Sequence, residues 1–387
     1  MRRALAALAA MVVLWTFAPV AALADEAATV TLAASGGPVE FRQTVTLSGA
    51  VSPAADGETV EIRDDTDALV ATLSTDPVGS FSTSFAPDRT VTLHAVWNAV
   101  TSQPVTVRVR AVVTVRMSSV RLFGTAAVRG SVAPAVPGAR VEVSLVHSGR
   151  TVATKTPRVG SAGGYTASFR VMEPGRYRAR ATFVDDTHLR GTAATESSTT
   201  PLPTLRQGSR SDFVRLLEQR LLELHYRLVG INRAYDDRTA DAVLAFRKVQ
   251  GMDRVFTVNP SVWRALADPR VPKPRLDVRG FHIEIDQTHQ VLYTVQRAEV
   301  TNIIHISSGK PSTPTHDGSF HVSRKIAGFS PHHLYYPSYF DGNRAIHGWT
   351  EVPTYPASHG CVRVPYWHAR WIFGLATIGT RVIVYHS

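Results

Sequence analysis

Residues 357–364 read Ala-Ser-His-Gly-Cys-Val-Arg-Val and contain Cys361, the only cysteine among the 387 residues of the chain. A single cysteine excludes a disulfide framework, an iron–sulfur site and a cysteine-rich zinc site. A cysteine that acts as a nucleophile needs a nearby base to form the thiolate and hydrogen-bond donors for the developing oxyanion. If Cys361 is a nucleophile, both are expected near it in the fold.

The base expected for Cys361 is His347, which lies in an upstream run, residues 345–348, that reads Ala-Ile-His-Gly. A Pro-containing loop between the two motifs can fold this histidine back onto the thiol. Gly360 permits a close approach of the backbone, so the N–H groups around Gly360 and Cys361 could form an oxyanion hole. His359, two residues before the cysteine, suits positioning better than proton abstraction. Outside such a run, a lone cysteine is more often an inert packing residue.

The Ser-His-Gly-Cys run with an upstream His-Gly pair resembles the signature of the L,D-transpeptidase catalytic domain, also called the YkuD-like domain. The resemblance extends over residues 276–387 and includes the upstream stretches 307–309 and 313–320. It implies Cys361 as the nucleophile, His347 as its base and the Gly348 carbonyl as the group that orients the imidazole. The resemblance also implies that Ser358, His359 and Gly360 shape the site.

Substrate contacts are expected from Arg363, Trp349 and Tyr339. Arg363 stands two residues after the cysteine, where some members of the family have Asn. The loop between His347 and Ser358 has ten residues, which is short beside many members and bears on the shape of the groove. Aromatic residues that can line this groove, or else pack in the core or at the rim, are Tyr335, Tyr336, Tyr339, Trp349 and Tyr355.

The histidines of this region show no metal-ligand spacing. Eleven of the fifteen follow residue 276, but none stands in a His-Glu-x-x-His or comparable pattern. We expect solvated or structural histidines, no metal and no cofactor.

Hydrophobic alternation predicts a mostly-β catalytic domain with one helix. The expected strands are Val278–Ile285, Gln290–Val295, Val300–Ser307, Gly318–Val322 and Thr380–Tyr385, and the expected helix is Tyr366–Leu375.

A helical pattern precedes this domain, between linkers at residues 199–203 and 269–274. Ser211 can cap a first helix, a second suits Asp237–Val249, and a short third follows Asn259. Residues 206–268 resemble the three-helix peptidoglycan-binding domain in Gly208, Val214, Leu217, Leu224-His225-Tyr226, Thr239, Ala242-Val243, Phe246, Gln250-Gly251, Val262-Trp263 and Leu266. The stretch 235–238 and the pair Leu217-Glu218 depart from that family's pattern. The resemblance implies binding of glycan or stem peptide; a module that only packs is the alternative.

The N-terminal half repeats itself. Gly49, Pro53, Gly57, Val60 and Glu61 recur 81 positions later as Gly130, Pro134, Gly138, Val141 and Glu142. A repeat of about 80 residues, made of short strands in which polar and apolar residues alternate, has the size of a small β-sandwich. We expect two immunoglobulin-like sandwiches, residues 27–108 and 109–200, which resemble bacterial surface domains and act as spacers or, alternatively, bind a ligand.

The N-terminus has the form of a secretory signal. Two arginines precede an apolar run that ends in Ala22-Leu23-Ala24, which predicts a signal peptide over 1–24 with cleavage after Ala24; a retained membrane anchor is the alternative. The formal net charge is +11, with a negative balance over 25–108 and positive balances from 109 onward. Export disfavours nucleic acid as the partner and leaves anionic lipid and anionic wall polymers.

These features together predict an exported multidomain cell-wall enzyme whose partners are the stem peptides and glycan of peptidoglycan. By resemblance, Cys361 would attack the carbonyl that links a meso-diaminoacid to the terminal D-alanine of a tetrapeptide stem, and a neighbouring amine would resolve the thioester to give a 3→3 cross-link. The family also implies inactivation by carbapenems. The alternatives are resolution by water, by a free D-amino acid or by a protein amine, and a wall-binding protein without catalysis.

Overall fold

The computed structural model describes residues 27–387, so the predicted signal peptide lies outside the described residues. The chain divides into two compact units. The first runs to Val112 and includes Val184–Arg190, and the second holds Val113–Phe183 and Gly191–Ser387. None of the helices within residues 27–387 is long and apolar enough to cross a membrane.

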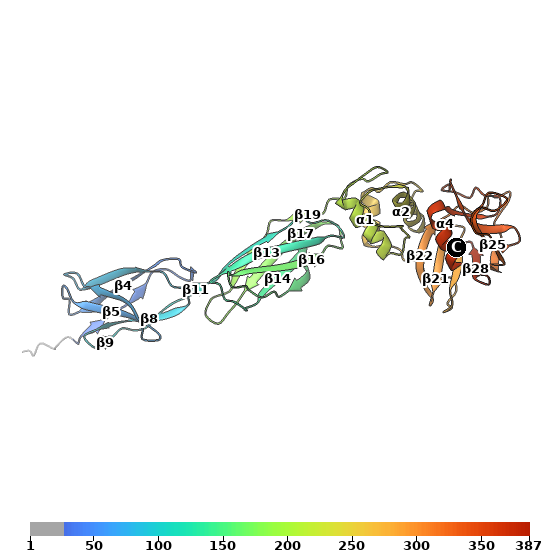
Figure 1. The fold of residues 1–387 in the computed structure, drawn as a ribbon. Helices are drawn as coiled ribbons and strands as arrows, with labels where there is room; N and C mark the ends of the chain where they lie inside the picture. Colours follow the sequence, from blue (N-terminus) through green and yellow to red (C-terminus); the bar gives the residue numbers. More distant parts are fainter. Residues whose placement is uncertain (1–26) are drawn as a thin grey trace, which may run out of the picture. The chain divides into compact units, whose positions relative to one another are not determined.

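The first unit is a β-sandwich (Figure 1). One sheet has the order β1-β4-β2 with β7 also paired to β4, and the other has the order β10-β8-β5-β6 with β9 paired to β8. The inward residues Leu47, Ile62 and Leu93 are fully buried in its core. Its strands are β1 (Thr29–Val30), β2 (Ala33–Ala34), β3 (Val39–Glu40), β4 (Val45–Ser52), β5 (Thr59–Asp64), β6 (Leu69–Ser74), β7 (Ser80–Phe85), β8 (Val91–Trp97), β9 (Val100–Thr101), β10 (Val105–Val107) and β11 (Val109–Arg110).

The second unit begins with another two-sheet module. The sheets have the orders β12-β13-β16 and β15-β14-β17-β18, with β19 also paired to β17. The strands are β12 (Val112–Met117), β13 (Thr125–Ala133), β14 (Val141–His147), β15 (Arg150–Lys155), β16 (Gly164–Arg170), β17 (Arg176–Phe183), β18 (Gly191–Ala194) and β19 (Ser198–Thr199).

The sequence repeat has a structural reason at its glycines. A Cβ on Gly49 would lie 2.0 Å from the Thr31 carbonyl oxygen and 2.4 Å from the Phe81 ring. A Cβ on Gly130 would lie 2.0 Å from the Thr114 carbonyl oxygen and 2.4 Å from the Tyr165 hydroxyl. In both modules a neighbouring strand and an aromatic ring cross the same point of the backbone, and only glycine leaves room for them.

Three helices follow, and they begin where the sequence predicts. Helix α1 is Asp212–Glu223, α2 is Asp237–Val249 and α3 is Pro260–Ala267. The side chains of Ser211, Asp236 and Asn259 accept hydrogen bonds from the backbone N–H groups of Val214, Thr239 and Val262. Such caps satisfy N–H groups that have no partner within the helix, which is why they fix where a helix begins.

The C-terminal region contains two sheets and helix α4. One sheet has the order β22-β21-β20-β28-β23, and the other has the order β24-β25-β26-β27. Their strands are β20 (His282–Asp286), β21 (Val291–Gln296), β22 (Glu299–His305), β23 (Gly318–His321), β24 (Arg324–Lys325), β25 (Tyr335–Asp341), β26 (Arg344–Trp349), β27 (Val362–Pro365) and β28 (Arg381–Tyr385). Helix α4 is Tyr366–Leu375, as predicted. The sheet of β24–β27 was not predicted.

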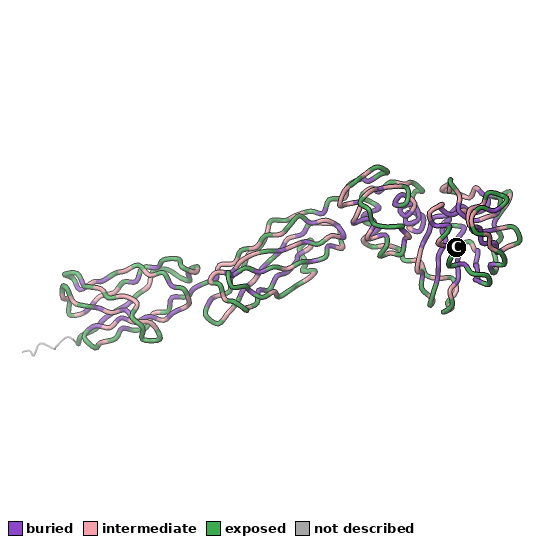
Figure 2. The backbone as a smooth tube through the Cα atoms, in the orientation of Figure 1, coloured by how far each residue is buried: buried purple, intermediate pink, exposed green. Residues whose placement is uncertain are grey.

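The helices and the larger C-terminal sheet share one hydrophobic core, although the sequence suggested a linker between two separate domains. Leu217, Val243 and Phe246 of the helices belong to the same buried cluster as Tyr293 and Ile303 of the sheet. Helix α2 contacts β22. Most residues of α2 and about half of those of β22 are buried, and Figure 2 colours buried residues purple along the chain. This contact brings residues of the helical module close to the loops around Cys361.

Candidate active site

Two parallel strands place the predicted nucleophile and base on one face. In the pairing of β26 with β27, Ile346 lies opposite Val362 and His347 opposite Arg363. Ile346 and Val362 point into the core. Because side chains alternate along a strand, His347 and Arg363 point to the other face. Cys361 precedes β27 by one residue and shares that face with Arg363.

The His347 imidazole is held in its neutral form. It is 2% exposed, and its Nδ1 lies 3.0 Å from the carbonyl oxygen of Gly348, which accepts the hydrogen bond. Burial lowers the pKa of His347 to about 4, although this hydrogen bond opposes the shift. A proton fixed on Nδ1 leaves Nε2 as the acceptor. This geometry suits a general base at neutral pH.

Cys361 is a protonated thiol at rest. Burial raises the pKa of Cys361 above its ordinary value, while the Ala345 N–H and the charges of Arg344 and Arg363 act in the opposite direction. The Sγ lies 3.8 Å from the carbonyl oxygen of Asn343. With a thiol of raised pKa and an imidazole of lowered pKa, the two groups form a neutral pair at neutral pH. A thiol in this state needs to lose its proton before its sulfur can act as a nucleophile.

The turn that presents Cys361 is closed by Ser358. The Ser358 hydroxyl donates to the carbonyl oxygen of Cys361 at 2.5 Å and accepts the Gly360 N–H at 3.1 Å. The hydrogen bond to Ser358 occupies the Gly360 N–H, which was one of the two expected oxyanion donors. The Cys361 N–H is the expected donor that remains. Gly360 has a φ of +107°, and a Cβ there would lie 2.8 Å from Arg344 Nε. The position therefore requires glycine.

Three further residues brace this turn, and sequence reasoning did not assign them a role. The Thr313 hydroxyl donates to the Ser358 carbonyl oxygen at 3.1 Å, and the Thr315 hydroxyl donates to the Gly360 carbonyl oxygen at 3.0 Å. Arg344 Nε donates to the Pro314 carbonyl oxygen at 3.2 Å. The available signals were the Thr-Pro-Thr run and the position of Arg344 three residues before His347.

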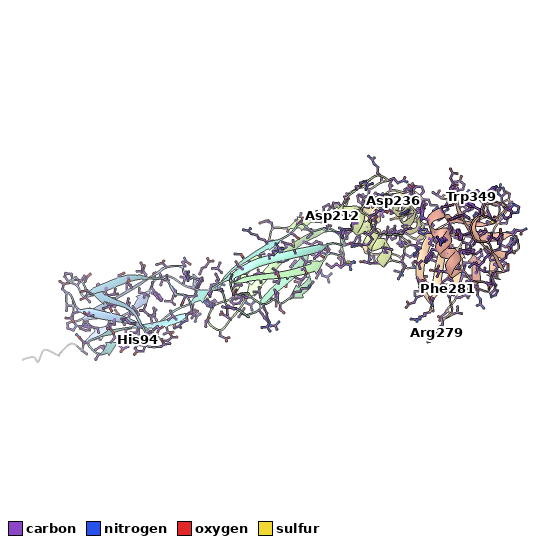
Figure 3. The ribbon with its side chains drawn as sticks, in the orientation of Figure 1. His94, Asp212, Asp236, Arg279, Phe281 and Trp349 are labelled. Atoms are coloured by element: carbon purple, nitrogen blue, oxygen red, sulfur yellow. The ribbon has the colours of Figure 1, made fainter. Side chains whose placement is uncertain are left out.

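The remaining predicted site residues differ in accessibility. Trp349 (labelled in Figure 3) lies next to His347, with ring centroids 5.6 Å apart, and the Arg363 guanidinium lies 5.1 Å from the centre of its indole. His359 is exposed, and its Nε2 lies 3.5 Å from Lys310 Nζ. Tyr339 is only 4% exposed and its ring is covered by Arg324, so it offers a substrate little surface.

Comparison with known proteins identifies this region. The model of the L,D-transpeptidase catalytic domain family matches residues 280–384. An L,D-transpeptidase structure from Xylanimonas cellulosilytica is 35% identical and covers 48% of this chain and 99% of its own, with a TM-score of 0.46. The structure of the catalytic domain of an Enterococcus faecium L,D-transpeptidase is 26% identical. The match covers 28% of this chain and 98% of the other chain, with a TM-score of 0.25. No curated protein matches the chain.

Proposed function

Because the chain belongs to the L,D-transpeptidase family, we propose that it is an exported cell-wall enzyme that forms a thioester between Cys361 and a peptidoglycan tetrapeptide stem and passes the acyl group to an amine. The observation that carries this proposal is the shared face of the lone cysteine and a histidine whose Nδ1 is bonded to the Gly348 carbonyl. That arrangement leaves one ring nitrogen free to take the thiol proton.

The acylation step follows from these groups. His347 Nε2 takes the proton from Cys361 Sγ while the sulfur attacks the carbonyl that links the third residue of the stem to its terminal D-alanine. The Cys361 N–H is our candidate donor to the oxyanion. When the tetrahedral intermediate collapses, the C–N bond breaks, His347 returns its proton to the leaving amine, and D-alanine departs. Base catalysis of this kind contributes roughly 10²–10⁴-fold.

Transfer repeats the same proton movements in reverse. The amine of a neighbouring stem attacks the thioester carbonyl and His347 accepts a proton from it. The C–S bond then breaks, and His347 delivers this proton to Cys361 Sγ, which regenerates the thiol. A meso-diaminoacid side chain as the acceptor gives a 3→3 cross-link. Water in its place gives a tripeptide, and a free D-amino acid gives exchange. None of these steps uses a metal or an organic cofactor.

Arg363 and Trp349 are the proposed substrate contacts. Within residues 27–387, the Arg363 guanidinium makes no hydrogen bond or ion pair and is held over the indole of Trp349. A guanidinium with free donors on the same face as the thiol can receive a carboxylate in two parallel hydrogen bonds. The stem peptide carries such carboxylates beside the bond that is cut.

The other parts of the chain fit a wall enzyme. The predicted signal peptide, with cleavage after Ala24, would direct export. The two β-sandwich modules are proposed as immunoglobulin-like spacers, and the three-helix module as a site for glycan or stem peptide. The positive balance that begins at residue 109 suits an anionic wall.

The test is to incubate the mature protein with disaccharide-tetrapeptide and to identify the products by mass spectrometry. The wild type should yield a dimer that lacks one D-alanine, and Cys361→Ala should yield none. His347→Ala should lose about 10²–10⁴-fold in rate. The matched control is His321→Ala, which alters an exposed histidine of the same domain and should retain the wild-type rate.

The products separate the alternatives. A cysteine-dependent tripeptide without dimer would assign a carboxypeptidase, and incorporation of added D-amino acid would assign exchange. Identical product profiles for wild type and Cys361→Ala would overturn the acyl-enzyme mechanism on this substrate and favour a wall-binding protein.

A further inference from the structure

The loop between the base and the nucleophile is anchored along its backbone. It leaves β26 after Trp349 and reaches the turn at Ser358. The Ser307 hydroxyl donates to the Tyr355 carbonyl oxygen at 2.7 Å, and the Ala357 and Ser358 N–H groups donate to the Ser308 carbonyl oxygen at 3.0 Å. These bonds come from the catalytic domain itself. Two further anchors depend on side chains of the helical module.

One anchor begins at Lys248 in helix α2, which belongs to the helical module. Lys248 is 2% exposed. Its Nζ donates to the carbonyl oxygens of Gln290 at 3.0 Å and Ile306 at 3.1 Å, and lies 2.6 Å from His305 Nδ1. Burial lowers the pKa of Lys248 well below its ordinary value. The three acceptors oppose this shift, because they match the three N–H groups of an ammonium and stabilise the charged form. All three acceptors belong to the catalytic domain.

His305 continues this connection to the loop. The ring is 1% exposed, and its Nε2 lies 2.9 Å from the carbonyl oxygen of Val352. A carbonyl oxygen can only accept, so Nε2 carries the proton and Nδ1 is the acceptor for Lys248. Burial and the charge of Lys248 lower the pKa of His305, which keeps the ring neutral and this tautomer in place. The lysine thus fixes the ring that holds Val352.

A second anchor from the helical module is direct. Arg254 lies just beyond α2 and donates to the Thr354 carbonyl oxygen at 3.0 Å and to the Thr288 carbonyl oxygen at 2.8 Å. Val352 and Thr354 are alternate residues of the same loop. Between them, Lys248 and Arg254 hold the middle of the segment that joins His347 to Cys361.

We propose that Lys248, acting through His305, and Arg254 are positioning residues for the transpeptidase reaction, so that the helical module is a working part of the catalytic unit. This inference rests on the proposed function. Neither residue touches the reacting atoms. If the loop shifts, the Ser358 turn shifts with it, and the thiol moves relative to His347 Nε2. A displacement of about 1 Å can cost about 10²-fold in rate.

The principal test is Lys248→Met, which keeps the length of the side chain and removes its donors. We expect kcat in the tetrapeptide assay to fall by about 10²-fold with KM little changed, because the substrate contacts stay in place. Hydrogen exchange of the loop peptide 350–358 should become faster. The matched control is Val243→Ala, which removes fully buried carbon atoms from the same helix without touching the loop. At a similar loss of thermal stability, it should leave kcat and loop exchange near wild-type values.

Arg254→Ala gives an independent result, because Arg254 is exposed and its loss should not prevent folding. We expect about tenfold lower kcat with unchanged KM. Arg254→Lys, which keeps a positively charged donor group, should recover part of the kcat that Arg254→Ala loses. The control is Arg264→Ala, an exposed arginine of α3, which should behave as wild type.

The outcomes are separable from those of the proposed function. A wild-type protein that makes no cysteine-dependent product overturns the function, whatever the variants do. An active wild type with unchanged kcat and unchanged loop exchange in both Lys248→Met and Arg254→Ala overturns the positioning role. Equal loss of kcat in Lys248→Met and Val243→Ala, at equal stability, also overturns it, because the effect is then that of general destabilisation.

Discussion

At the residue scale, the pKa of His347 determines the acid limit of activity. The unprotonated imidazole is the proposed base, and burial lowers its pKa to about 4. The pH dependence of kcat/KM reports the free enzyme. We expect kcat/KM to keep most of its neutral value at pH 5 and to fall with a midpoint near pH 4. Initial rates from pH 3.5 to 8, with circular dichroism to confirm folding, measure this. A midpoint near 6.5, the value of an ordinary histidine, would contradict the buried neutral base.

Gly360 gives a second prediction at this scale. Gly360→Ala introduces a Cβ 2.8 Å from Arg344 Nε at a backbone φ of +107°. We expect the activity to fall by about 10²-fold, because the turn that carries Cys361 must shift, and the free energy of unfolding to fall by about 1–3 kcal/mol from backbone strain.

The control for Gly360→Ala is Gly379→Ala. Gly379 also has a positive φ, +86°, but nothing lies within 4 Å of its Cβ position. It should show a comparable strain cost in denaturant unfolding with near-normal activity. Equal activity of the two variants would argue against a tightly packed turn at Cys361.

At the element scale, the β-sandwich modules depend on the close approach at their repeated glycines. Gly130→Ala would force a Cβ to 2.0 Å from the Thr114 carbonyl oxygen, and we expect it to destabilise its module by about 3 kcal/mol. Differential scanning calorimetry should show one thermal transition at lower temperature. Gly164→Ala, in the adjacent strand with nothing within 4 Å, is the control. A Gly130→Ala protein that melts like wild type would contradict this reading of the repeat.

The elements also show what the sequence could predict. Helices α2 and α4 match their predicted ranges, because the spacing of apolar residues along a helix is a local signal. Strands β25 and β26 escaped prediction. Their central residues are buried on both faces, which removes the alternation of polar and apolar residues that marks a strand. They form the sheet that carries His347.

Some residues of the candidate site could be predicted from the sequence, and others could not. The proposed nucleophile, its proposed base and the turn glycine could be predicted from the two short sequence runs at 345–348 and 357–364. Lys248 and His305 could not, because they are 57 positions apart and meet only through the contact of α2 with β22. A lysine inside an amphipathic helix gives no signal that its ammonium is buried in another part of the fold.

At the scale of the whole molecule, buried neutral histidines make stability depend on pH. Burial lowers the pKa of His347 to about 4 and of His368 to about 3. The unfolded chain, with an ordinary pKa near 6.5, binds these protons first as the pH falls. The contribution of these two histidines to the free energy of unfolding is therefore fully present above pH 6.5, and it decreases as the pH falls below this value. At pH 4 each of the two histidines lowers the free energy of unfolding by about 3 kcal/mol relative to neutral pH.

Urea unfolding at pH 7, 5 and 4 measures this dependence. We expect the midpoint for the C-terminal region to fall with each step. His368→Gln should flatten the dependence, although it also lowers stability at pH 7. A midpoint that stays constant between pH 7 and pH 4 would show that these histidines are not buried in the neutral form.

The central claim is that Cys361 carries the stem peptide as a thioester. The most direct measurement is the intact mass of the protein, quenched in acid within seconds of mixing with disaccharide-tetrapeptide. The wild type should gain the mass of the disaccharide-tripeptide acyl group, that is, the substrate less D-alanine, on the peptide that contains Cys361. Hydroxylamine should remove the adduct. Cys361→Ala should gain nothing. An adduct on another residue, or product formation by Cys361→Ala, would contradict the account.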